Sequence, residues 1–174
     1  MNTRKGNVQL VSWGQSSDLE IIAQAGFEHE FLSCFYRVSL RDPSACGRAL
    51  LRRRVVIIDD VLSDHGFTPF RAVALRAGFR SVQSTPLLSS SGSLWGVLST
   101  HGLEPHHPSQ CQLEALRTIA QAAANAIVRL HTLEPGAEDD HSTKVSQARI
   151  LKSRQLLRRT QKFAENDLDP MFGE

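Results

Sequence analysis

The chain has 174 residues, of which 41% are apolar and 22% charged, and its formal net charge is +2. This length predicts one domain of ordinary size with an appendage. The longest uncharged stretch is interrupted by polar residues, so it falls short of the roughly 18 apolar residues that span a bilayer. No apolar segment follows the charges at the N-terminus, which excludes a secretory signal.

The three cysteines, Cys34, Cys46 and Cys111, have no paired spacing. An odd number without a CxxC pattern argues against a disulfide framework and against a structural zinc site. We therefore expect a reduced, cytoplasmic protein.

The first part of the chain alternates short strands and helices. Residues 8–11 form an apolar segment typical of a strand, and the period of two in residues 19–25 predicts a half-buried second strand. Residues 28–36 favour a short helix. Pro43 lies where a first helical turn tolerates it, which predicts a helix start at residues 42–44.

The middle of the chain begins with residues 55–58, which are β-branched throughout. This pattern predicts a central strand buried on both faces. Residues 67–77 favour a helix that ends at Gly78. Residues 79–88 and 94–100 then flank a serine-rich segment containing Gly92, which predicts a hairpin.

The last predicted element of the domain is a long helix. Ser109 and Gln112 have the spacing of a capping box that opens it. An apolar seam at heptad spacing follows, and its small residues would let another helix approach closely. The residues of this seam are Leu113, Leu116, Ala120, Ala123, Ile127 and Leu130.

The order of elements predicts an α+β fold with a mixed, mainly antiparallel sheet of five to six strands flanked by helices. Pro135-Gly136 and the acidic residues 138–140 suggest a boundary, with a domain at residues 1–134 and an acidic linker and basic helical tail at 135–174. Residues 142–163 carry seven basic residues and no acidic one. A helical connector explains this tail best; nucleic-acid binding is the less favoured alternative, because only one aromatic residue is present.

Several segments together carry a family resemblance, although each is weak alone. They are residues 6–10, 19–27, 44–50, 55–61, 77–87 (AGFRSVQSTPL), 94–101 (LWGVLSTH) and 105–109. Their order and spacing resemble a GAF domain, of a bacterial subgroup found beside PAS modules and histidine kinases in multidomain sensors. The resemblance covers about residues 6–130.

The resemblance implies a PAS-related sheet with a small-ligand pocket on one face, closed by a lid between the third strand and the hairpin. The residues implied for this pocket are Phe67, Phe70, Val73 and Phe79 on the lid, and Gln83, Thr85, Trp95, Val97, Ser99 and His101 on the sheet. An apolar wall with a few hydroxyl groups suits a small organic ligand. Simple filling of the core explains the same residues equally well.

The family also implies dimerisation through terminal helices. GAF domains usually begin with a helix before the first strand, and here the chain starts about five residues before that strand. We therefore expect the seam on residues 113–130 to lack its usual partner within the chain. The implied function is a non-catalytic sensory domain in bacterial two-component signalling, with a second copy, a histidine kinase or another signalling protein as partner.

One enzyme of GAF type is the alternative. Free methionine-(R)-sulfoxide reductase uses a cysteine at the position matched by Cys46, but it needs further cysteines in the segment matched by residues 61–82, and this chain has none there. We therefore expect no catalytic residue.

Cofactor binding has no clear sequence signal, and the identity of any cofactor stays open. His101, Glu104, His106 and His107 are the only histidine and carboxylate cluster, but the glycine and prolines among them indicate a connecting loop rather than a metal site. His65, the one histidine near the place for a haem ligand, reads as part of a turn. The patterns for cyclic nucleotides and for a covalent bilin are absent.

Overall fold

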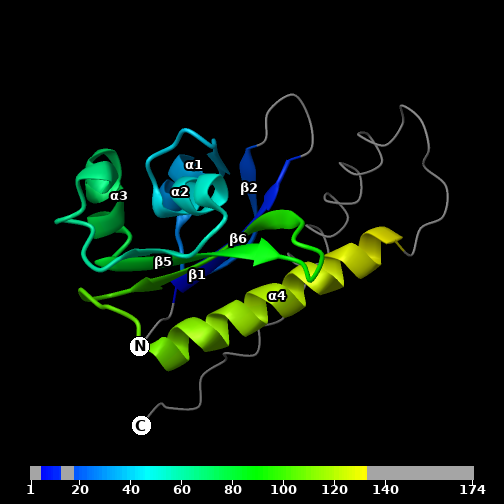
Figure 1. Ribbon diagram of the computed structural model, residues 1–174. Helices are drawn as coiled ribbons and strands as arrows, with labels where there is room; N and C mark the ends of the chain where they lie inside the picture. Colours follow the sequence, from blue (N-terminus) through cyan, green and yellow to red (C-terminus); the bar gives the residue numbers. More distant parts are fainter. Residues whose placement is uncertain (1–4, 13–17, 133–174) are drawn as a thin grey trace, which may run out of the picture. The chain divides into compact units, whose positions relative to one another are not determined.

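The computed structural model describes residues 5–12 and 18–132, which belong to the first of two units of the chain, Met1–Pro135. Figure 1 shows this unit as a sheet with helices on both faces. The linker and tail predicted for residues 135–174 lie outside the described residues. No helix in the described part of the chain combines the length and apolar character needed to cross a bilayer.

In the described part of the chain, six strands form one sheet in the order β3-β2-β1-β6-β5-β4. They are β1 (Lys5–Val11), β2 (Leu19–Ala25), β3 (Arg37–Val38), β4 (Val56–Ile58), β5 (Ser81–Leu88) and β6 (Leu94–Gly102). Every pairing among them is antiparallel. The predicted α+β class is confirmed, and its sheet is antiparallel rather than mixed.

The prediction of a central strand at residues 55–58 is wrong. β4 lies at the edge of the sheet, and among the described strands it pairs with β5 alone. Its Val56 and Ile58 are nevertheless buried, because they join the core that α2 (Ala45–Arg52) covers. Cover by a helix therefore explains why this run is apolar, and the strand does not need neighbouring strands on both sides.

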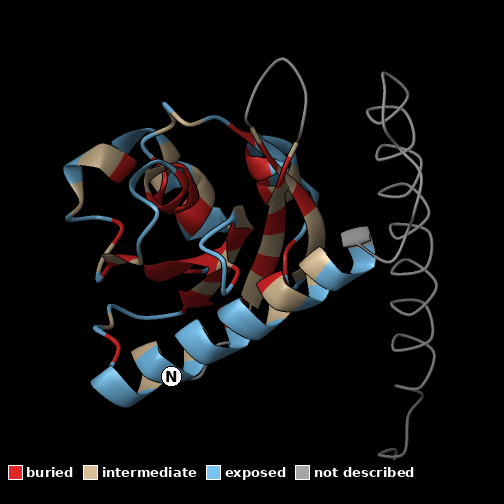
Figure 2. Ribbon diagram, turned by 45° about the vertical axis from the view of Figure 1, so that its right-hand side comes forward, coloured by how far each residue is buried: buried red, intermediate tan, exposed pale blue. Residues whose placement is uncertain are grey.

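Helices cover the two faces of the sheet unequally, as Figure 2 shows. One face carries α1 (His29–Phe35), α2, the 3-10 helix η1 (His65–Phe70) and α3 (Arg71–Arg76), and the other carries α4 (Gln110–Thr132). The single helix predicted at residues 67–77 is therefore two short helices. Pro69 lies inside η1 and cannot donate a backbone hydrogen bond there.

The helix ends follow their local sequence. Ser44 caps α2 by accepting a hydrogen bond from the Gly47 N–H at 3.3 Å. Ser109 and Gln112 form the predicted capping box, in which each backbone N–H donates to the other side chain. Gly78 ends α3 with a φ of 70°, a left-handed conformation that glycine adopts without strain.

Two separate cores form on the two faces of the sheet. The face under α1, α2, η1 and α3 holds the larger one, which contains the buried phenylalanines. On the other face, α4 packs Ala120 and Ala124 against Leu87, and Ala123 and Ile127 join this smaller cluster. The sheet therefore covers part of the predicted α4 seam, while the absence of its usual helical partner stays a prediction.

Candidate functional site

The larger core contains a small internal space between the sheet and the helices, which we call the inner pocket. Phe31 and Phe67 line it from the helical side, and Ser84, Ser99 and His101 line it from the sheet. Its volume is about 10 Å³, room for about one water molecule and far too small for an organic ligand. The inner pocket is thus closed in this structure.

His101 is the most unusual group of the inner pocket. Its ring meets the rings of Phe27, Phe31 and Phe79 edge to face, with centroids at 4.8, 5.6 and 4.7 Å. Burial lowers the pKa of His101 to about 3, although a backbone hydrogen bond with Lys5 acts the other way. The imidazole is therefore neutral at physiological pH, and its Nδ1 has no hydrogen-bond partner among the described residues.

A second unpartnered polar atom lines the same space. Asn7 is 4% exposed, and no described group donates to its Oδ1. The two serines of the pocket are different, because Ser84 Oγ and Ser99 Oγ lie 2.8 Å apart and satisfy each other. Since a buried acceptor without a donor costs free energy, the unpartnered atoms of Asn7 and His101 mark where a ligand with N–H or O–H groups would gain most.

Cys46 also lines the inner pocket. Burial raises the pKa of its thiol to about 11, against a smaller opposing effect of the hydrogen bond with Ser44, whose Oγ is 3.3 Å from Sγ. Since the thiolate is the reactive form of cysteine, this side chain is a weak nucleophile at neutral pH.

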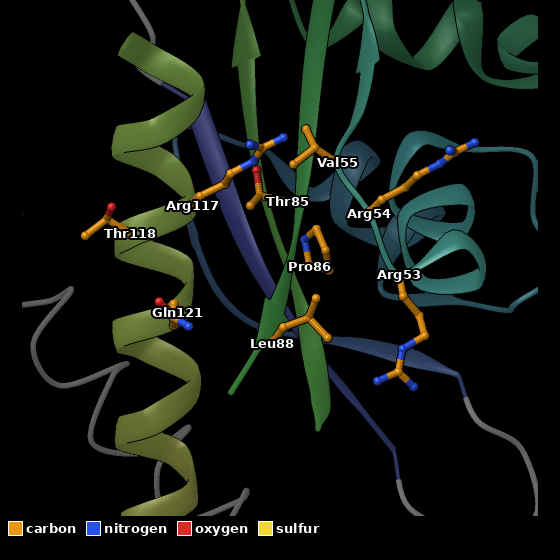
Figure 3. Close-up of a pocket in the computed structure, with 9 residues that line it drawn as sticks. All are labelled: Arg53, Arg54, Val55, Thr85, Pro86, Leu88, Arg117, Thr118 and Gln121. Atoms are coloured by element: carbon orange, nitrogen blue, oxygen red, sulfur yellow. The ribbon is translucent and has the colours of Figure 1, made fainter. Parts of the chain in front are cut away.

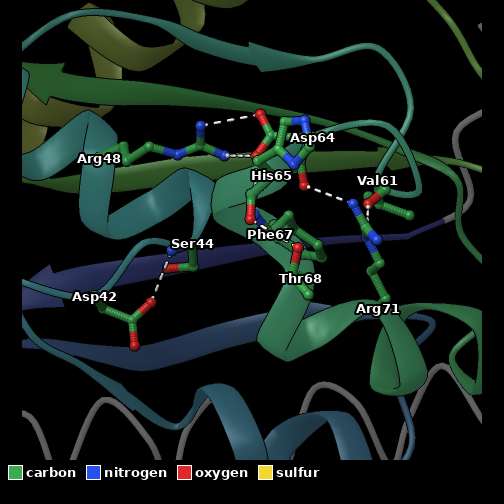
Figure 4. A network of polar contacts seen from close by, with 9 residues as sticks. All are labelled: Asp42, Ser44, Arg48, Val61, Asp64, His65, Phe67, Thr68 and Arg71. Carbon is green, nitrogen blue, oxygen red and sulfur yellow. Dashed lines mark hydrogen bonds and ion pairs between the residues drawn. The ribbon is translucent and has the colours of Figure 1, made fainter.

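The connection that holds η1 over the pocket is fixed by an ion-pair network (Figure 4). Arg48 of α2 donates two hydrogen bonds to the carboxylate of Asp64, at 3.0 and 3.1 Å. Asp64 also accepts from the Phe67 N–H at 2.9 Å, and Arg71 donates to the backbone carbonyls of Val61 and Asp64. The network ties the lid residue Phe67 to α2 and α3.

The ten residues predicted for a ligand pocket do not share one space. Phe67, Phe79, Ser99 and His101 line the inner pocket. Val97 is buried in the same core, and Phe70 packs against Phe67 with ring centroids 5.5 Å apart. Val73 instead borders a small surface depression next to Lys5 and Glu28.

The remaining three predicted residues lie on the opposite face of the sheet. Thr85 borders a groove beside α4, and Gln83 donates to its Oγ1 at 3.2 Å. Trp95 packs against the cluster around Leu87 under α4. Placing Gln83, Thr85 and Trp95 in the inner pocket was wrong. For Gln83 and Thr85 the face of β5 was misassigned, because side chains of a strand alternate between the two faces. Trp95 lies on β6 where the pairing with β5 shifts register between Leu87 and Leu88, which breaks the regular alternation.

Sequence reasoning also missed residues that line the inner pocket. Phe31 and Phe35 were assigned to a helix but not to a site, and Asn7 and Ser84 were read only as strand residues. The signal for Asn7 was available, because the first strand carries two amides, Asn7 and Gln9, at alternate inward positions of the period-two pattern.

The histidines at positions 101, 106 and 107, which the sequence groups together near the end of β6, have different neighbours in the structure. His106 Nε2 lies 3.3 Å from Gln112 Oε1, and His107 Nδ1 lies 2.8 Å from Asp59 Oδ1 at the surface. His101 is enclosed in the core. Across residues 5–12 and 18–132, no group of three or more histidine, cysteine or acidic side chains is arranged to hold a metal ion.

Comparison with protein families gives a match to the GAF domain over residues 10–127. The chain belongs to the GAF domain family. The match spans most of the chain, and domains of this family are typical of signalling proteins. A comparison with curated proteins finds no match.

Solved structures agree with this fold. A domain of a protein assigned as a two-component sensor histidine kinase, from Sinorhizobium meliloti 1021, has 16% identity and a TM-score of 0.59, and the match covers 76% of this chain and 83% of that one. The GAF domain of a phosphoenolpyruvate-protein phosphotransferase from Coxiella burnetii has 16% identity and a TM-score of 0.63, over 75% and 74% of the two chains. A type II free methionine-R-sulfoxide reductase from Thermoplasma acidophilum has 18% identity and a TM-score of 0.56, over 70% and 77%.

Proposed function

We propose that this GAF domain is a non-catalytic sensor whose inner pocket receives a small, uncharged ligand rich in N–H or O–H groups. The observation that carries the proposal is the neutral, buried His101, whose unpartnered Nδ1 lies in a cage of phenylalanine rings. Asn7 Oδ1 adds a second acceptor in the same space. A charged ligand is disfavoured, because the pocket residues supply no counter-ion.

Binding requires the inner pocket to open. Sites for small organic molecules usually enclose about 300 Å³ or more, whereas the closed pocket measures about 10 Å³. The aromatic side chain of Phe67 is the natural part to move, because it lies on the short η1 helix and not on the sheet. The ligand would then select a minor open state and shift the population toward it.

The response would reach a partner through the helical surface of the domain. We infer a homodimer, a histidine kinase or another signalling protein as partner. In α4 the exposed face carries an apolar stripe of its own: Ala115, Ile119, Ala122, Ala126 and Leu130. This stripe replaces the buried Ala120 as the contact we propose for a second copy, since Ala120 is 1% exposed and already packs on the sheet.

A reductase is the competing function, because free methionine-R-sulfoxide reductases are among the structural neighbours. Two observations favour the sensor. The thiol of Cys46 is buried with its pKa raised to about 11, and residues 61–82 contain no cysteine to act with it. A Cys46→Ser variant should leave any turnover of free methionine sulfoxide unchanged, and a turnover that this change abolishes would establish the reductase.

The sensor hypothesis is tested by screening uncharged compounds with amide, alcohol or neutral amino groups. A compound that binds should raise the melting temperature of the protein. Hits should lose their effect in His101→Phe, which keeps an aromatic ring but removes the acceptor. The matched control is His65→Gln, at an exposed histidine outside the pocket. If every hit stabilises His101→Phe as much as the unchanged protein, the inner pocket is not the binding site.

A further inference from the structure

A second cavity lies on the opposite face of the sheet from the inner pocket. It is a groove of about 380 Å³ between α4, β5 and the connection from α2 to β4. Figure 3 shows its walls: α4 on one side and residues 53–55 on the other, with β5 between them. We call it the arginine groove, because Arg53, Arg54 and Arg117 all line it.

The charge of the arginine groove is one-sided. Among the described residues, no acidic side chain lines it. Arg53 donates to the carbonyl of Gly92, whereas Arg54 and Arg117 make no hydrogen bond or ion pair with any described residue. Two guanidinium groups on opposite walls are therefore available to an anion from solution.

The side chains of Arg54 and Arg117 point in different directions. In Figure 3, Arg117 extends from α4 across Thr85, while the guanidinium of Arg54 is turned away from the groove. Both side chains are exposed. Exposed side chains change rotamer within nanoseconds, so Arg54 can turn inward when an anion arrives.

The backbone of this wall is held in an uncommon conformation. Arg53 ends α2 with φ 52° and ψ 32°, and it is the one non-glycine residue with a positive φ in the described part of the chain. This left-handed turn places Arg53, Arg54 and Val55 in succession along the groove. A left-handed residue is a common way for a helix to end, and here it turns the chain from α2 into the wall of the groove.

The floor of the groove offers both a donor and an apolar surface. Thr85 is 2% exposed, and its Oγ1 accepts a hydrogen bond from Gln83, so the hydroxyl hydrogen remains free to donate. Gln121 adds an amide from α4. Pro86 and Leu88 supply apolar area beside these groups, on which a small organic group can pack.

We propose that the arginine groove binds a small organic phosphate, with the phosphate between Arg117, Arg54 and Thr85 and the organic group over Pro86 and Leu88. Guanidinium groups bind both carboxylates and phosphates in pairs of parallel hydrogen bonds. Donors from three sides match the three free oxygens of a phosphate ester better than the two of a carboxylate. The site is independent of the inner pocket, since the sheet separates them.

Titration of the full chain with phenyl phosphate, followed by calorimetry or backbone amide shifts, tests the proposal. We expect saturable binding that Arg117→Gln and Arg54→Gln each weaken roughly tenfold, the equivalent of about 1.4 kcal/mol for a lost charge-assisted hydrogen bond. Arg52→Gln is the matched control, because Arg52 is exposed on the same helix end but does not line the groove. Benzoate, which has the same ring, should bind more weakly.

Three outcomes would overturn the proposal. Absence of binding at millimolar phenyl phosphate would remove the site. An equal loss in Arg52→Gln would show diffuse attraction to surface charge instead of a groove. Benzoate binding as tightly as phenyl phosphate would reject the phosphate assignment. All variants carry exposed substitutions, and unchanged melting temperatures confirm that they fold.

Discussion

Arg48 and Asp64 form a bidentate ion pair that joins α2 to the start of η1, with N–O distances of 3.0 and 3.1 Å. Both side chains are about one-fifth exposed, so water screens the pair only in part. Partial burial would raise the pKa of Asp64, but the hydrogen bonds and charge of Arg48 and the Phe67 N–H outweigh it and hold this pKa below its ordinary value. The pair therefore stabilises the lid of the inner pocket through an ionised carboxylate.

Replacing this carboxylate should loosen the lid. We expect Asp64→Asn to lower the free energy of unfolding by about 2 kcal/mol, the usual cost of a lost hydrogen bond to a charged group. Because the folded pKa of Asp64 is depressed, its contribution is present above pH ~4 and is lost as the pH falls through the lower folded pKa. Urea unfolding at pH 7 and pH 3 measures both effects.

The control for this experiment is Asp59→Asn, at an exposed carboxylate paired with His107. It should change stability by less than about 0.5 kcal/mol, as surface substitutions usually do. If Asp59→Asn costs as much as Asp64→Asn, the Arg48 pair is not special. A higher protease sensitivity of residues 61–70 in Asp64→Asn would locate the loosening at the lid.

His101 predicts a separate dependence of stability on pH. Its folded pKa of about 3 lies below the ordinary value of 6.5. The unfolded chain therefore binds the proton more readily, and stability is full above pH ~6.5 and falls as the pH drops toward 3. One such group contributes a slope of about 1.4 kcal/mol per pH unit within this window.

Substitution of this histidine should remove that slope. When the pH is lowered from 6 to 4, the free energy of unfolding of the unchanged protein should fall by about 2 kcal/mol more than that of His101→Phe. His65→Gln, at an exposed position, should keep the full slope. Identical slopes in His101→Phe and the unchanged protein would mean that His101 already binds a proton in the fold.

The three cysteines should differ in their reaction with a thiol reagent. Cys111 and Cys34 are exposed, and Cys46 is buried. Burial first, and then the charges of Asp42 and Glu30, raise the pKa of Cys34, so Cys111 should react faster. Cys46 should react last, and only on unfolding, because its pKa is raised to about 11.

Timed labelling at pH 8 with iodoacetamide, followed by peptide mass spectrometry, measures this order. Addition of urea should release the third thiol. Rapid labelling of Cys46 in the folded protein would indicate an accessible thiolate, and it would favour the reductase over the sensor.

Much of the fold could be predicted because its signals are local. The capping box of Ser109 and Gln112, the helix stop at Gly78 and the hairpin turn at Gly92, whose φ is 81°, depend on neighbouring residues alone, and all three are confirmed. The edge position of β4 depends on which strands are neighbours in space. No local pattern carries that information, so an apolar run was taken for a central strand.

The candidate site was harder to predict for the same reason. Phe67 and Phe79 do line the inner pocket, as predicted for the lid, whereas their role in ligand binding stays a prediction. Gln83 and Thr85 were assigned to the wrong face of the sheet. Every residue from Ser81 to Leu87 is buried, so the sequence of β5 shows no alternation between exposed and buried positions. Which face each side chain joins was then decided by α4 and α2, elements far away in sequence.

The two faces of α4 lead to the last prediction. Ala120 is 1% exposed and packs on the sheet, whereas Ile119 is 56% exposed on the outer stripe. Ala120→Glu should therefore lower the free energy of unfolding by about 3 kcal/mol or more, because it buries an unpaired charge. Ile119→Glu should leave the free energy of unfolding of the monomer within about 0.5 kcal/mol of its original value.

If a second copy docks on the outer stripe, Ile119→Glu should instead convert a dimer into a folded monomer. Sedimentation velocity at several protein concentrations measures the association, and circular dichroism confirms that the variant is folded. Thr118→Glu is the matched control, because Thr118 is an exposed neighbour on α4 that lies outside the stripe. A dimer that survives Ile119→Glu would reject this face as the interface, since a charge at its centre could not be desolvated without a large cost.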